Sequence, residues 1–298
     1  MSGFNKWEQK KHAEDWMIFP KNIGSKLSID EVAISNGELY TVITNKAAKG
    51  KKNAIVAMAN GTKASDVNAV LAKIPLERRN LVKEITLDMS DAMDAIVRKS
   101  FPKAVRVTDR FHVQQLVSEA LQEVRISLRR EALKEENEEI KKARSEKKCY
   151  CPKIFKNGDT KKQLLARSRY LLFKPSSKWN AQQEERSEIL FKEYSELKEA
   201  YDISMMFRGF YEHSKNIFEA KKKLDEWHKK IEEKEMETFL VAAESIRLHE
   251  TTVLNYFINR STNASAESFN AKLKGFRALV RGVRDKTFFL FRIAKIYG

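Results

Sequence analysis

Residues 85–113 (ITLDMSDAMDAIVRKSFPKAVRVTDRFHV) constrain the fold most, because they predict a strand, a helix and a second strand in succession. Each short apolar run ends at an aspartate, Asp88 and Asp109. We expect Ser90 to cap the helix between them and Pro102 to stop it. Such a crossover makes the two strands parallel. Both carboxylates are therefore expected at the carboxyl-terminal edge of one sheet, where open sheets bind ligands.

Three β-rich runs precede this stretch, at residues 26–34, 38–45 and 51–60. Turn-forming residues (SNG and AAKGKK) separate them, which predicts an antiparallel meander. Asp30 stands at the centre of the first run among apolar neighbours. Because a charged group inside an apolar strand needs a partner or a function, Asp30 is a further candidate site residue.

Residues 64–73 have the apolar spacing of a helix packed on one face, which completes the order βββαβαβ. This order matches an α/β fold of the ribonuclease-H-like type, in which a mixed sheet places the first strand centrally and next to the fourth. In that arrangement Asp30 and Asp88 are neighbours.

Beyond residue 113 the strand pattern disappears and helical periodicity takes over. We therefore divide the chain into an N-terminal arm or linker, the first part of the core, a helical insertion, and C-terminal catalytic and basic helices that complete the core. These segments cover residues 1–25, 26–112, 113–258 and 259–298. The fold class is thus a ribonuclease-H-like mixed sheet with a long all-helical insertion between the last strand and the C-terminal catalytic helix.

The balance of charge favours a polyanionic partner. The chain has 57 Lys plus Arg against 41 Asp plus Glu, a formal charge of +16, and nucleic acid is the leading candidate. A membrane surface is the rival, but no apolar run reaches ~18 residues and the N-terminus lacks a signal-peptide core. We expect a cytoplasmic protein. Cys149 and Cys151 are expected to be free thiols, because without nearby histidines they cannot complete a structural zinc site.

The last forty residues differ from everything before them. Ser261 or Thr262 is expected to cap a helix in which Asn263, Glu267 and Asn270 share one face. Basic residues with interleaved phenylalanines follow, which indicates a phosphate-binding surface on an apolar anchor. The predicted DNA contacts are Lys272, Lys274, Arg277, Arg281 and Arg284.

Asp30, Asp88 and Glu267 fit two-metal phosphoryl transfer, which needs hard carboxylates that hold two Mg²⁺ ions ~3.5–4 Å apart. Mn²⁺ is the expected substitute. The competing interpretation is structural: Asp88 caps a helix, Asp30 pairs with a cation, and Glu267 is a solvated acid. The three acids occur together, in this order, on a basic chain that ends in a basic helix. This combination favours the catalytic interpretation over the structural one.

Three motifs carry a resemblance to a known family: SIDE, then ITLDMSDAM with FPKAVRVTDRFHV, and finally NASAESFNAKLKGFRALVRG. They resemble the catalytic region of bacterial insertion-sequence DDE transposases of the ISL-three family, from about residue 26 to the C-terminus. The resemblance implies a nucleoid-associated enzyme that cuts transposon ends and joins them to target DNA. It implies Asp30, Asp88 and Glu267 as catalytic, metal-binding acids.

Asp109 and His112 match the D-x-x-H signature of many such transposases, and with Asn263 and Asn270 they are expected to orient the metal-binding acids or the DNA backbone. A core histidine is the alternative for His112. The implied partners are double-stranded DNA and further copies of the chain on DNA. Members of this family usually carry a cysteine-rich or helix-turn-helix DNA-reading region ahead of the catalytic core, whereas here about twenty-five residues precede the first predicted strand. The resemblance therefore implies a separately encoded N-terminal DNA-reading protein as a further partner, with truncation or degeneration as the competing account.

Two other functions stay open at the level of sequence. One is a nuclease or resolvase of the same fold, which uses water as its only nucleophile and performs no strand transfer. The other is a non-catalytic, basic, helical nucleic-acid-binding protein in which the acids are structural.

Overall fold

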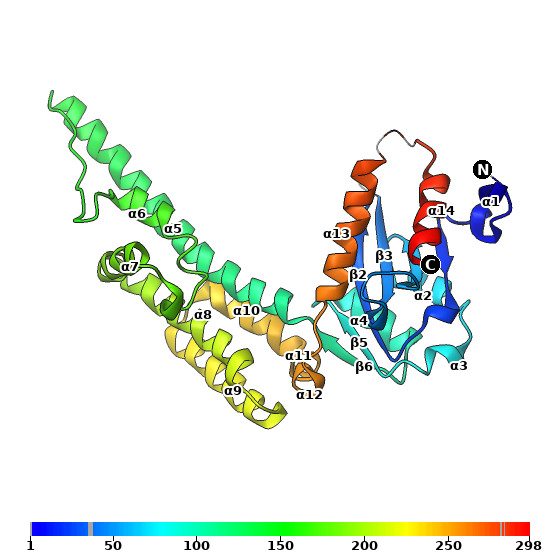
Figure 1. Cartoon of the computed structure of the whole chain (residues 1–298). Helices are drawn as coiled ribbons and strands as arrows, with labels where there is room; N and C mark the ends of the chain where they lie inside the picture. The colour runs from blue at the N-terminus through cyan, green and yellow to red at the C-terminus, as the bar shows by residue number, and fades with distance from the viewer. Residues whose placement is uncertain (1, 35–37, 281, 283) are drawn as a thin grey trace. The chain divides into compact units, whose positions relative to one another are not determined.

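The computed structural model describes residues 2–34, 38–280, 282 and 284–298. It contains a six-stranded sheet of order β1-β4-β3-β2-β5-β6 (Figure 1). β2, β3 and β4 form the antiparallel meander, whereas β5 and β6 run parallel to β2. This arrangement confirms the predicted ribonuclease-H-like sheet. The strands are β1 (Trp16–Ile18), β2 (Lys26–Ala33), β3 (Leu39–Asn45), β4 (Ile55–Asn60), β5 (Glu84–Leu87) and β6 (Val105–Thr108).

Side-chain alternation assigns the residues of β2 and β5 to two different faces. The odd-numbered Leu27, Ile29, Ile85 and Leu87 are buried with α2 (Ala64–Leu71) and α4 (Asp91–Ser100). The opposite face is covered by α13 (Ala264–Leu279), which contacts β2, and by α14 (Lys286–Tyr297). Even-numbered residues of β2 and β5 point to this second face, and they include Asp30. In Figure 1, α13 lies alongside β2.

The expected N-terminal arm contains a strand of the sheet. β1 pairs antiparallel with β4, and Met17 at its centre is fully buried. With only three residues, β1 is too short for an alternating pattern to reveal it. Around it lie α1 (Ser2–Asn5), η1 (Glu8–Lys11) and η2 (Pro20–Asn22).

The chain divides into two compact units: a core unit (residues 1–113 and 249–298) and an insertion unit (residues 114–248). The insertion unit thus ends before the expected residue 258. Its interior is aromatic, with Phe207 and Trp227 fully buried and 4.6 Å between their ring centroids. Its helices are the C-terminal part of α5 (Arg110–Ser145), α6 (Lys161–Arg167), η4 (Ser176–Lys178), α7 (Ala181–Glu193), α8 (Ser195–His213), α9 (Ile217–Lys234) and α10 (Glu237–Leu248). None of the described helices is both long and apolar enough to cross a membrane.

The chain re-enters the core unit through α11 (Glu250–Leu254) and α12 (Tyr256–Asn259), which are fastened to the edge of the sheet. Thr252 and Thr108 share a hydrogen bond between their hydroxyls (2.6 Å), and the amide of Asn255 donates to the carbonyl of Arg106 (2.9 Å). This segment leads directly into α13. The remaining short helices are η3 (Lys46–Ala48) and α3 (Leu76–Arg79).

Two predicted helix caps differ from the structure. α4 begins after Ser90, but the Ser90 side chain makes no capping hydrogen bond. The residue before α13 is Asn263 rather than Ser261 or Thr262. Ser261 is unavailable as a cap because its hydroxyl donates to the carboxylate of Glu84.

Candidate catalytic site

Asp30 lies on the central strand β2 with its carboxylate held at both oxygens. The backbone N–H of Glu31 donates to Oδ1 and the amide of Asn270 donates to Oδ2, each at 2.7 Å. Burial, followed by the negative charge of Asp88, raises the pKa of Asp30 to about 6. Glu267 contributes to the same rise. Asp30 is thus an oriented carboxylate that is poorly solvated and sits among other negative charges.

Asp88 follows the last residue of β5. Ser28 of β2 pairs with Thr86 of β5, so Asp30 and Asp88 each lie two residues beyond the same rung of the parallel ladder. Nε2 of His112 lies 2.9 Å from Oδ1 of Asp88. This interaction with the Asp88 side chain is the main cause of the raised pKa of His112.

Glu267 is on α13, and it lies closest to the pair that follows β6. Oxygen atoms of Asp109 and Glu267 and a ring nitrogen of His112 all lie within 4.8 Å of one another. Burial and then the charge of Asp109 raise the pKa of Glu267, and Asp88 adds to this effect. The structure therefore brings Glu267 to the sheet edge, where it forms one group of potential ligands with Asp109 and His112.

Asp109 also holds the start of α13. It is 1% exposed, and its Oδ1 accepts a hydrogen bond from the backbone N–H of Asn263 (3.0 Å). Burial is the main cause of its raised pKa. Among the described residues, Oδ2 of Asp109 has no hydrogen-bond partner, and neither polar atom of the fully buried Asn263 side chain has one. Asn270 holds Asp30 directly, whereas Asn263 acts here through its backbone.

These residues fit a divalent cation. The donors are hard carboxylate oxygens, of the kind that Mg²⁺ and Mn²⁺ prefer. Oδ2 of Asp109 is buried and available, and mutual repulsion helps to raise the pKa of Asp30, Asp109 and Glu267. A cation relieves such repulsion.

A network around Glu84 and Lys46 was not predicted from the sequence. The Glu84 carboxylate, whose side chain is 3% exposed, accepts hydrogen bonds from Asn259 (2.9 Å) and Ser261. Nζ of Lys46 lies 3.9 Å from Glu84 and donates to the hydroxyl of Thr86. Burial lowers the pKa of Lys46 to about 8, although Glu84 and then Asp109 oppose the change. The alternation of polar Glu84, Thr86 and Asp88 is the sequence signal that points to this face.

The predicted DNA-binding residues have different environments. Lys272 donates its ammonium group to the carbonyl of Gly50 (3.1 Å), and the guanidinium of Arg277 lies 4.9 Å from the ring centroid of Phe289. Lys274 and Arg284 are exposed, and Arg281 lies outside the described residues. The core unit has 28 Lys plus Arg against 16 Asp plus Glu, so it carries +12 of the net charge of +16.

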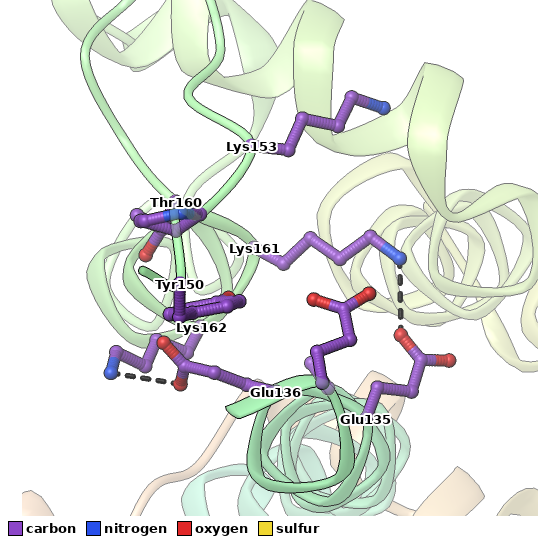
Figure 2. Close-up of a pocket in the computed structure, with 10 residues that line it drawn as sticks. Glu135, Glu136, Tyr150, Lys153, Thr160, Lys161 and Lys162 are labelled. Atoms are coloured by element: carbon purple, nitrogen blue, oxygen red, sulfur yellow. Dashed lines mark hydrogen bonds and ion pairs between the residues drawn. The ribbon is translucent and has the colours of Figure 1, made fainter. Parts of the chain in front are cut away.

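The insertion unit has a small polar cavity of about 180 Å³ (Figure 2). Lys161 and Lys162 pair across it with Glu135 (3.0 Å) and Glu136 (2.8 Å). The opposite charges that line this cavity therefore neutralise one another. Cys149 and Cys151 are exposed and free, which agrees with their predicted state.

The family model of the ISL3 (ISL-three) DDE transposases, described as Transposase, matches residues 27–293. The chain belongs to this transposase family. No curated protein matches the chain. Membership confirms the resemblance of the three motifs, and it implies a DNA-transposing enzyme that binds DNA and uses a divalent metal. The matched range spans both parts of the transposase core unit together with the insertion unit.

Proposed function

We propose that this transposase cleaves DNA strands at the ends of a mobile element and joins them to target DNA, with Mg²⁺ as the natural cofactor and Mn²⁺ as a substitute. The observation that carries the proposal is the convergence of Asp30, Asp88, Asp109 and Glu267. They come from segments distant in sequence, yet the charge of Asp88 helps to raise the pKa of Asp30, Asp109 and Glu267. Repulsion among four acids at one sheet edge disfavours folding unless a cation neutralises it. Their presence together therefore indicates that a function requires them.

In this proposal Asp30, Asp88 and Glu267 hold two metal ions, and their neighbours orient them. Asn270 fixes the carboxylate plane of Asp30, and His112 lies against Asp88. Asp109 fixes the start of α13, the helix that bears Glu267. Bound divalent ions would activate the attacking hydroxyl and neutralise charge that develops on the phosphate. Asp109 lies near enough to Glu267 for the two carboxylates to bind the same metal ion.

Replacing Glu267 by Gln tests the assignment, because the change keeps the size of the side chain and removes one negative charge. Metal-dependent cleavage of a duplex that carries the DNA flanking the gene should fall by about a thousandfold or more. Binding of the duplex and the far-ultraviolet circular dichroism spectrum should not change. Joining of the cut strand to a second duplex separates a transposase from a nuclease of the same fold.

Glu244→Gln and Asp285→Asn are the matched controls. Glu244 is exposed, and Asp285 caps α14 through Oδ1, which an asparagine retains. Both variants should cleave like the wild type. Normal cleavage by Glu267→Gln would remove Glu267 from the chemistry. Normal cleavage by variants of all four acids at the sheet edge would refute the metal-dependent mechanism.

A further inference from the structure

The turn between β3 and β4 contains four lysines in seven residues, which the proposed mechanism does not use. This basic loop, residues 46–53 (KAAKGKKN), contains Lys46, Lys49, Lys51 and Lys52. Asn45 starts it by accepting a hydrogen bond from the backbone N–H of Ala47 (3.0 Å). Gly50 has φ +65°, a left-handed conformation in which a side chain is strained. The loop is thus a defined turn rather than a simple extended connection.

The basic loop is held in place by one of its own lysines, Lys46, and by Lys272 of α13. The side chain of Lys46 is 13% exposed, and its ammonium group is bound to Thr86 and Glu84 on the face of the sheet. Lys272 of α13 donates to the carbonyl of Gly50, and the Phe269 side chain packs against the same glycine. The loop is therefore anchored to β5 at one end and to α13 at its centre.

The other three lysines of the loop face the solvent. Lys49, Lys51 and Lys52 are exposed, and no carboxylate in the described part of the chain lies at ion-pair distance from any of them. Three uncompensated positive charges within four residues repel one another, whereas a row of phosphates would neutralise them. Because the loop is already anchored, little conformational entropy is lost when it binds such a partner.

The loop also lies close to the acidic site. Phe269, which packs on Gly50, directly precedes Asn270, which holds Asp30. The charge of Asp109 acts on Lys46 at the base of the loop. The centre of the loop therefore packs against the residue of α13 that directly precedes the one holding Asp30.

We propose that the basic loop binds the phosphodiester backbone of the DNA strand next to the site of cleavage, through Lys49, Lys51 and Lys52. Lys272 acts as a positioning residue, since its ammonium group is engaged with the loop. The location near the cleaved phosphate rests on the proposed function. The binding of DNA by the loop is tested independently of it.

The first experiment measures fluorescence anisotropy of the full chain with a duplex of random sequence in EDTA, which prevents cleavage. Replacing all three exposed lysines by Ala should lower the salt dependence of log K by about two to three units, at ~0.9 per lost phosphate contact. At 0.1 M salt the affinity should fall on the order of 100-fold. The matched control replaces three exposed lysines of the core unit that also lack an acidic partner, namely Lys83, Lys99 and Lys103.

The control variant should change the slope of log K against the logarithm of the salt concentration by less than about half a unit. Equal slopes for the two triple variants would overturn the proposal. Because this comparison needs no catalysis, failure of the wild type to cleave any duplex would refute the proposed function and leave the loop assignment standing.

A second experiment locates the strand. Lys51→Cys, in a chain with Cys149→Ser and Cys151→Ser, is coupled to a short photocrosslinker and irradiated with the cleavable duplex. Crosslinks should map within a few nucleotides of the phosphate that the wild type cuts. Crosslinks confined to distant positions, or none above those of the same reagent at Lys99→Cys, would contradict the assignment.

Discussion

Replacing Asp30 by Asn should make the metal-free protein more stable at neutral pH, although it removes a proposed metal ligand. The pKa of Asp30 is raised from 3.8 to about 6, mainly by burial and then by Asp88. The folded protein therefore binds this proton more tightly than the unfolded chain does. Above pH 6 the charged carboxylate lowers the free energy of unfolding, and this penalty disappears as the pH falls through 6 toward 3.8.

The magnitude follows from the two pKa values and from the contacts of Asp30. A rise from 3.8 to about 6 corresponds to about 3 kcal/mol at pH 7.5, since each pKa unit is worth 1.36 kcal/mol. Partial exposure of Asp30 reduces this to roughly 2 kcal/mol. An asparagine keeps the acceptor for the N–H of Glu31 but places an amide against the donor of Asn270, which costs about 1 kcal/mol. We expect a net stabilisation of about 1 kcal/mol.

Urea unfolding of the wild type and the variant in EDTA measures this difference at pH 7.5 and at pH 4.5. Asp30→Asn should be more stable at pH 7.5 and no more stable than the wild type at pH 4.5. Asp66→Asn, at an exposed position of α2, is the control and should show neither effect. Addition of Mg²⁺ should stabilise the wild type more than Asp30→Asn. A variant that is less stable at pH 7.5, or whose gain persists at pH 4.5, would refute the electrostatic reasoning.

Two further predictions concern the neighbours of the acids. Titration of His112 by NMR should give a pKa above 6.5, and Asp88→Asn should lower it, because Asp88 is the main cause of the rise; an unchanged pKa would show that the two side chains do not interact in solution. Glu84→Ala should lower the free energy of unfolding by about 3–5 kcal/mol in urea titrations, because Lys46 stays buried without its partner. A loss below about 1 kcal/mol would mean that the Glu84 network does not hold the segment before α13.

The order of β2 to β6 and the position of two acids could be predicted from the sequence, because the individual strands follow local patterns and their succession matches a known fold type. Alternation in β2 and β3 and the turn residues between them specify a meander. The crossover through α4 returns the chain to the end of the sheet where β5 began, so β5 and β6 are parallel and both end at one edge. The parallel pairing of β2 with β5, which makes Asp30 and Asp88 neighbours, was expected from the ribonuclease-H-like order of the elements.

The partners of individual side chains were decided only by the tertiary structure. The contact of Asp109 with Asn263 joins residues 154 apart, and that of Glu84 with Asn259 joins residues 175 apart. A helical pattern indicates which face of α13 is polar, but not where α13 crosses the sheet. That crossing, set by the packing of Phe269 and its neighbours, places Glu267 beside Asp109.

β1 and the basic loop show the same division. The sequence of the loop determines its charge, but the anchoring of Lys46 and Gly50 depends on β5 and α13, which follow much later in the chain. β1 is a strand because the edge of β4 offers it hydrogen bonds, not because three residues have a strand pattern of their own. Sequence patterns specify the type of each element and which of its faces is apolar. The register of the strands and the angle at which a helix crosses the sheet are set only when distant segments pack against one another.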